Sequence, residues 1–149
     1  NRESENSPLD AIIKYSKKNK IKIFYVTNKI HLKKPSKNHK SFRDFLIKNK
    51  INFIEKNSLK NIQFLKNYLK KYPDSILLTT FCFFKINNQI IKLLKNRIFN
   101  YHLGKIPEQV GASATFWYTM TRQKFTAITF HRITDELDSG EVLYEKNLV

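Results

Sequence analysis

The chain has 149 residues, a length typical of one domain, and 41% of them are hydrophobic and 13% aromatic. This composition excludes a disordered chain, because disordered segments are poor in such residues. The longest apolar run is about half the roughly 20 residues that cross a bilayer, and no signal peptide begins the sequence. The single cysteine, Cys82, excludes a disulfide within the chain. These features predict a soluble, cytoplasmic protein that does not act at a membrane.

Positive charge is concentrated in the first two thirds of the chain. Residues 1–99 contain 23 basic and 6 acidic residues, a net charge of +17, whereas residues 100–149 have a net charge of −1. Lysine, which suits solvated surfaces, greatly outnumbers arginine, whose planar guanidinium suits the recognition of nucleic-acid bases. The charge therefore favours a solvated basic surface, and a specific nucleic-acid site stays open as the alternative.

Apolar residues alternate between strand and helix spacing through the first hundred residues. Ser7 and Pro8 are typical of a helix N-terminus. The lysine-rich segment 29–40 is expected to be a surface connection. Further strands are expected at 21–26, 51–54, 75–80 and 97–102, and further helices at 40–49, 59–71 and 86–94. Repeated strand–helix units predict an α/β fold with a mostly parallel sheet and helices on both faces.

The last third of the chain holds all three glycines and neither of the two common glycine-rich phosphate motifs. Here the pattern predicts a loop over 103–112, a short helix over 113–121, a strand over 125–133, an acidic turn over 134–140 and a strand over 141–149. Phe116, Trp117 and Met120 are expected to be core residues of the short helix, and contacts of the aromatic pair with a ligand are the open alternative. Since the pattern begins on a helix and stops within a strand, we expect a fragment that lacks its first βα unit.

Of the four histidines, His102 and His131 stand where chemistry is expected. Asn100 and His102 are two residues apart on a predicted strand, so their side chains share one face near its C-terminal end, where open α/β sheets hold their sites. A histidine that merely bonds to a nearby carbonyl is the open alternative. His31 and His39 fall in the lysine-rich connection and are not expected in a site.

Three separated motifs resemble the signature of formyltransferases that use 10-formyltetrahydrofolate. They are Asn100-Tyr-His102 followed by Pro107 and Gly111, then Thr129-Phe-His131, and finally the acidic turn Thr134-Asp-Glu-Leu-Asp-Ser-Gly140. The resemblance covers the chain from about Ile76 to Val149, and the upstream units fit the family's Rossmann-like fold more loosely. It implies one formyltransferase catalytic domain over residues 1–149.

The resemblance also implies roles for individual residues. Asn100, His102 and Asp138 match the family's catalytic trio. Contacts to the folate are implied for Phe81, Phe83, Phe84, Ile86, Asp135 and Leu137. Supporting positions that do not react are Thr129, His131, Gly111 and Gly140. No metal is expected, because there is one cysteine and no pair of histidines four residues apart.

Formyl transfer explains why these residue types would be needed. An amine that attacks a formyl carbon produces an oxyanion, which requires hydrogen-bond donors, and releases a proton, which requires an acceptor. The amide of Asn100 and a protonated His102 can donate, while Asp138 can hold the imidazolium and help to accept the proton. Without the resemblance, a solvated acidic turn is the favoured interpretation of 134–140.

The loop before Gly111 departs from the family pattern. It lacks the usual Pro-Ser after His102 and the usual arginine before Gly111, and Ala127 stands where the family commonly has glycine. We predict transfer of a formyl group from 10-formyltetrahydrofolate, as cosubstrate, to a primary amine, with an amino-sugar nucleotide as the preferred acceptor. Glycinamide ribonucleotide and methionyl-tRNA are alternative acceptors, a homodimer is compatible with the sequence, and a non-catalytic, RNA-associated basic α/β module is the second alternative.

Overall fold

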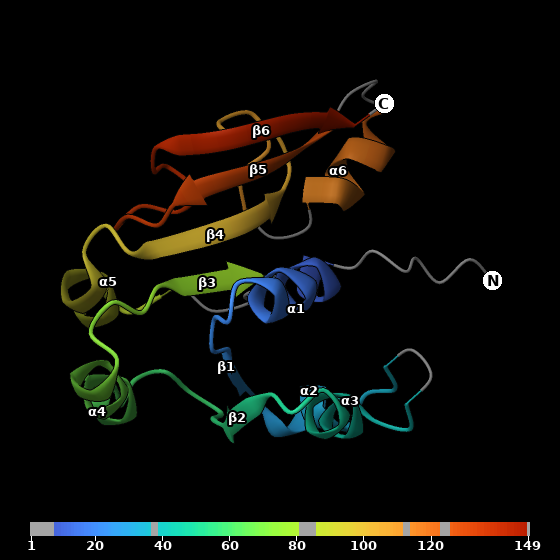
Figure 1. Ribbon diagram of the computed structural model, residues 1–149. Coiled ribbons are helices and arrows are strands. Elements are labelled where there is room, and N and C mark those ends of the chain that lie inside the picture. Colours follow the sequence, from blue (N-terminus) through green and yellow to red (C-terminus); the bar gives the residue numbers. More distant parts are fainter. Residues whose placement is uncertain (1–7, 37–38, 81–85, 112–113, 123–125, 149) are drawn as a thin grey trace. The chain divides into compact units, whose positions relative to one another are not determined.

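The computed structural model describes residues 8–36, 39–80, 86–111, 114–122 and 126–148 (Figure 1). The chain divides into two compact units, Asn1–Ser58 and Leu59–Val149. Each unit has its own sheet and its own cluster of buried apolar side chains. That residues 1–149 act as one catalytic domain stays a prediction.

In the part of the first unit that the structure describes, three helices accompany a two-stranded parallel sheet. Its elements are α1 (Pro8–Lys18), β1 (Phe24–Thr27), α2 (Lys29–Lys33), α3 (Phe42–Lys48) and β2 (Asn52–Glu55). The expected surface connection after β1 therefore begins as a helix. Asn28 caps this helix by accepting the backbone N–H of His31, and Leu32, only 2% exposed, anchors the helix in the core.

The second unit contains a four-stranded mixed sheet. Its elements are α4 (Gln63–Lys71), β3 (Leu77–Thr80), α5 (Asn88–Leu94), β4 (Ile98–Leu103), α6 (Ala114–Met120), β5 (Thr126–Arg132) and β6 (Val142–Leu148). Figure 1 shows the strands in the order β3-β4-β5-β6 across the sheet. Residues from α5 and β4, together with Ile62 and Ile86, form the core cluster of this unit.

The α/β fold expected from the sequence is confirmed. The pairs β1–β2 and β3–β4 are parallel, and helices separate the two strands of each pair along the chain. β5 and β6 extend the larger sheet antiparallel to their neighbours. Only residues 133–141 join β5 to β6, and a parallel pair requires a crossover of about a dozen residues or more.

Three apolar side chains of α6 are exposed and do not belong to the core. Phe116, Trp117 and Met120 are 56%, 62% and 63% exposed, and the Phe116 and Trp117 rings meet edge to face with centroids 5.6 Å apart. The expectation that these side chains are core is therefore wrong, because helical spacing identifies an apolar face without showing that another element covers it. Among the described residues, no helix is long and apolar enough to cross a membrane.

Candidate active site

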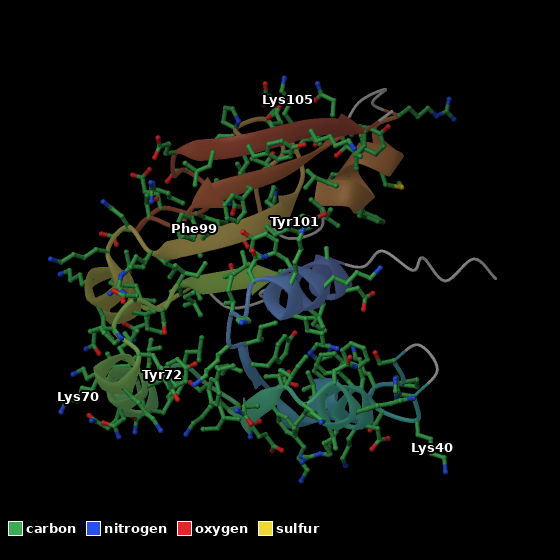
Figure 2. The ribbon with its side chains drawn as sticks, in the orientation of Figure 1. Lys40, Lys70, Tyr72, Phe99, Tyr101 and Lys105 are labelled. Atoms are coloured by element: carbon green, nitrogen blue, oxygen red, sulfur yellow. The ribbon has the colours of Figure 1, made fainter. Side chains whose placement is uncertain are left out.

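Alternation along β4 separates its side chains onto two faces of the sheet. Phe99 and Tyr101, both labelled in Figure 2, lie on one face. Ile98, Asn100 and His102 lie on the other face. Ile98 is fully buried in the core cluster, so this face passes from an apolar core residue to two polar side chains towards the C-terminal end of the strand.

The register of the sheet aligns polar residues from three strands. Thr79 on β3 and His131 on β5 are the partners of Asn100, and Thr129 on β5 is the partner of His102. Directly opposed residues of an antiparallel pair have their side chains on the same face. Thr129 is fully buried and its hydroxyl donates to the carbonyl oxygen of Gly104 at 2.7 Å, which ties the loop after β4 to the sheet.

The hydrogen bonds of His131 determine how the Asn100 amide is oriented. His131 Nδ1 lies 2.8 Å from the carbonyl oxygen of Arg132, which can only accept, so Nδ1 carries the hydrogen. In the neutral ring, Nε2 is then an acceptor, and it lies 3.2 Å from Asn100 Nδ2. Asn100 Oδ1 accepts the hydroxyl of Thr79 at 2.7 Å. Both ends of the amide are thereby fixed.

Burial keeps His131 in this neutral form. The residue is 1% exposed, and burial lowers the pKa of its imidazole below the ordinary value of 6.5. The carbonyl of Arg132 and the carboxylate of Asp138 oppose this effect, and the nearby His102 adds to it. The imidazole therefore accepts from Asn100 over the physiological pH range.

Asp138 reaches the two histidines from the loop between β5 and β6. The backbone N–H of Arg132 bonds to the carbonyl oxygen of Glu141 at 3.0 Å and closes the base of this loop. Asp138 itself has a φ of 49°, in the left-handed region that aspartate tolerates better than most residues. Gly140 is obligatory, since a Cβ at this position would come within 2.0 Å of the Arg132 carbonyl oxygen.

The carboxylate of Asp138 lies between the two imidazoles. Its Oδ1 is 3.6 Å from His131 Nε2, and its Oδ2 is 3.8 Å from His102 Nδ1. Oδ2 also accepts the backbone N–H of Gly111 at 2.7 Å. The side chain is 8% exposed. The neighbours of this nearly buried carboxylate are therefore the N–H of Gly111 and the two histidine rings.

His102 has an acceptor facing each of its ring nitrogens. Its Nε2 lies 2.6 Å from the carbonyl oxygen of Gln109, and its Nδ1 faces Asp138. The ring is 8% exposed. The carbonyl oxygen can only accept, so Nε2 carries a hydrogen, whereas Nδ1 is too far from Asp138 for a hydrogen bond. Both ring nitrogens thus face groups of the protein.

The structure brings Asn100, His102 and Asp138 into one connected network, with His131 between Asn100 and Asp138. Asp135 and Leu137, predicted to contact folate, are exposed on the Asp138 loop. Ile86 is 7% exposed and packs in the core cluster, which leaves little of it for a ligand. The other predicted folate contacts, Phe81, Phe83 and Phe84, lie outside the described residues.

Sequence reasoning missed two members of the network. Thr79 orients Asn100, and its signal was present, because it is one of two polar residues that end an apolar strand. Gln109 acts on His102 through its backbone carbonyl, and side-chain type carries no signal for such a contact. Among the described residues, no group of three or more histidine, cysteine and acidic side chains could hold a metal ion.

A family model described as formyl transferase matches residues 3–149. The chain belongs to the formyl transferase family. One curated relative is the bifunctional polymyxin resistance protein ArnA of Wigglesworthia glossinidia brevipalpis. It is 26% identical to this chain over 102 residues, which are 68% of this chain and 15% of ArnA. The chain spans less than a third of the length of the first curated relatives that it matches.

Two solved structures illustrate the likeness in fold. Glycinamide ribonucleotide transformylase 1 from Geobacillus kaustophilus matches with a TM-score of 0.72 and 14% identity, over 94% of this chain and 75% of that one. The formyltransferase PseJ from Anoxybacillus kamchatkensis, solved with UDP-4,6-dideoxy-4-formamido-L-AltNAc and tetrahydrofolate, matches with a TM-score of 0.56 and 20% identity, over 85% and 60%. Both support the Rossmann-like α/β fold of this formyl transferase family member.

Proposed function

We propose that this chain is the catalytic part of an enzyme that transfers a formyl group from 10-formyltetrahydrofolate to a primary amine. One observation carries the proposal: an amide, two imidazoles and a carboxylate form a connected, largely buried network in a chain of the formyl transferase family. Buried polar groups cost folding free energy unless they are paired, so four of them gathered at one place favour a functional role over a purely structural one.

Asn100 is the proposed donor to the formyl oxygen. Its Oδ1 accepts from Thr79, and one hydrogen of its Nδ2 faces His131. The second amide hydrogen makes no hydrogen bond to any residue that the structure describes. An amide fixed at both ends can donate this hydrogen to an oxygen that gains negative charge without having to reorient, which is the basis of stabilisation by preorganised donors.

Asp138 is the proposed acceptor of the proton that the amine releases. Its Oδ2 is held by Gly111, and both oxygens lie within 4 Å of an imidazole nitrogen. The unprotonated nitrogens of the two histidines lie where they can share the proton once the carboxylate has taken it. In this proposal, His102 acts on Asp138 and does not touch the formyl oxygen directly.

The donor set of the network fits a formyl-folate cosubstrate, because it offers one hydrogen-bond donor for an oxygen and one base for a proton. When bound, 10-formyltetrahydrofolate would supply the electrophilic formyl carbon, and as the amine bonds to that carbon the bond from the carbon to N10 would break, with a proton passing to N10 of the tetrahydrofolate that leaves. Among the described residues, Asp135 and Leu137 are the proposed contacts, since both are exposed on the loop that carries Asp138.

An amino-sugar nucleotide is the proposed acceptor. Support comes from the exposed, edge-to-face pair of Phe116 and Trp117 on α6, because aromatic side chains are suited to contacts with sugars and bases. PseJ was solved with a formamido sugar nucleotide, and its fold resembles that of this chain. Glycinamide ribonucleotide and methionyl-tRNA are the competing acceptors.

The test is an assay of the full-length protein with 10-formyltetrahydrofolate and each of the three acceptors. Formation of tetrahydrofolate that depends on an acceptor supports formyl transfer, and the acceptor with the highest kcat/KM identifies the substrate class. A folate ligand should also raise the unfolding temperature by mass action. No turnover and no response to folate, combined with RNA binding that weakens steeply with salt, would overturn the proposal in favour of a non-catalytic RNA-associated module.

A further inference from the structure

In the loop between β4 and α6, the side chain of Gln109 makes hydrogen bonds that hold the loop in place. Gln109 Oε1 accepts two hydrogen bonds, one from the backbone N–H of Lys105 at 2.9 Å and one from the hydroxyl of Thr126 at 3.0 Å. The backbone N–H of Gln109 also donates to the carbonyl oxygen of Lys105 at 2.6 Å. One side-chain oxygen therefore closes the turn and ties it to the first residue of β5.

The backbone of residues 109–111 contacts both His102 and Asp138. The carbonyl oxygen of Gln109 faces His102 Nε2 at 2.6 Å. Two residues later, the N–H of Gly111 donates to Asp138 Oδ2 at 2.7 Å. Gly111 has a φ of 86°, so the chain reverses within three residues in a way that glycine accommodates best. Displacing the turn would displace both contacts.

The carbonyl of Gln109 decides which nitrogen of His102 keeps its hydrogen. A carbonyl oxygen can only accept, so a neutral His102 in this position retains the hydrogen on Nε2. Its Nδ1 is then unprotonated and faces Asp138 Oδ2 at 3.8 Å, which is too long for a hydrogen bond. Nδ1 is accordingly the nitrogen that takes up or releases a proton beside the carboxylate.

We propose that Gln109 is a positioning residue, whose side-chain oxygen holds the 109–111 backbone so that the hydrogen of neutral His102 stays on Nε2 and Nδ1 is left to exchange a proton beside Asp138. The inference deepens the proposed function and rests on it for its catalytic consequence. The assignment of the ring hydrogen rests on the hydrogen bonds alone.

The experiment compares Gln109→Leu with two matched variants of the full-length protein. Gln109→Leu removes the acceptor for Lys105 and Thr126 while keeping a side chain of similar size. Gln109→Glu keeps an acceptor oxygen at the same position. Glu108→Gln is the control, since Glu108 is the adjacent residue and its side chain is 56% exposed and pairs with Lys105 at 3.4 Å. Long-range ¹H–¹⁵N NMR spectra then report which nitrogen of the neutral His102 ring carries hydrogen.

The expected result is a change of tautomer in one variant. In Gln109→Leu the ring hydrogen should move to Nδ1, because the carboxylate of Asp138 is a stronger acceptor than a displaced carbonyl. Wild type, Gln109→Glu and Glu108→Gln should keep the hydrogen on Nε2. In the transfer assay, Gln109→Leu should lower kcat by up to about 100-fold, as small misplacements of catalytic groups can, with KM changed much less.

A hydrogen that stays on Nε2 in Gln109→Leu overturns the inference. If that variant does not fold, Thr126→Val, which removes only the bond to β5, takes its place, and the complete absence of the Nδ1 tautomer there is the contradicting result. The spectra require neither folate nor acceptor. An inactive wild type would therefore count against the proposed function, while the spectra would still decide the role of Gln109.

Discussion

His31 in the first unit and His131 in the second unit both lie near a threonine, yet only His131 belongs to a network that contains an amide and a carboxylate. In the first unit, His31 Nδ1 lies 3.0 Å from the hydroxyl of Thr27, and its ring stacks on Phe42 with centroids 4.5 Å apart. In the second unit, His131 joins an amide and a carboxylate and lies two residues from the buried Thr129. The two histidines differ in burial, since His31 is half-buried and His131 is 1% exposed, but above all in the chemistry of their neighbours.

The pKa values of the two histidines express the same difference. Burial lowers the pKa of both imidazoles below 6.5. For His31 the charged neighbour is Lys34, which lowers the pKa further, and for His131 the carboxylate of Asp138 opposes the effect of burial. A buried histidine is thus a structural feature by default, and a carboxylate beside it is the signal that suggests proton chemistry.

The strongest test of this contrast removes the carboxylate. Asp138→Ala should lower kcat for formyl transfer by about 10²–10⁴-fold, the range expected for loss of a proton acceptor. Glu136→Ala, two residues earlier on the same loop and exposed, is the matched control and should stay near wild type. Steady-state kinetics at saturating acceptor measures both. Equal activity in the two variants would show that Asp138 is only a loop residue.

A second test uses the pH dependence of stability. Because the folded pKa of His131 lies below that of the unfolded chain, the unfolded state binds more protons as the pH falls through about 6.5. The contribution of neutral His131 to the free energy of unfolding is thus complete above pH 6.5 and is lost as the pH falls towards the pKa of the folded state. The same sign applies to His31.

His131→Asn and His31→Asn should therefore each reduce the loss of unfolding free energy between pH 7 and pH 5, measured by urea unfolding. At pH 7, His131→Asn should also cost about 1–3 kcal/mol, because the Asn100 amide loses a buried acceptor. An unchanged pH slope in His131→Asn would contradict the neutral, buried imidazole on which the orientation of Asn100 depends.

The smallest effects are expected from the two threonines. Thr129→Val leaves the buried carbonyl oxygen of Gly104 without its donor and should cost about 1–3 kcal/mol. Thr27→Val removes a partner of the partly buried His31 ring and should cost about 1 kcal/mol or less. Thermal or urea unfolding resolves the two. A larger cost for Thr27→Val would reverse the comparison between the two regions.

The sequence predicted the parts of the fold that depend on periodic patterns. Strand and helix spacing located β1 to β4 and the helices α3, α4 and α5, and the separation of two residues between Asn100 and His102 placed both on one face of β4. Asp138 was found by resemblance to a motif, since an acidic turn taken alone resembles any solvated turn. Nothing in the local pattern connects this residue with His102 on β4, 36 residues earlier.

The missed features depend on contacts that local patterns do not encode. Helix α2 forms because Asn28 caps it, within a segment whose lysines suggest only a surface connection. The exposed face of α6 has the spacing of a core helix. The carbonyl of Gln109 acts through its backbone position, which depends on two side-chain hydrogen bonds to residues 4 and 17 positions away.

The central claim is that the fixed amide of Asn100 stabilises the charge that develops during formyl transfer. The most direct measurement is the single-turnover rate of formyl transfer from 10-formyltetrahydrofolate by the wild-type protein and by Asn100→Ala, with folding checked by circular dichroism. The account predicts that the rate falls by about 10²–10³-fold, as expected for loss of one preorganised donor, while the fold is kept. A folded Asn100→Ala variant that transfers formyl groups at the wild-type rate would contradict it.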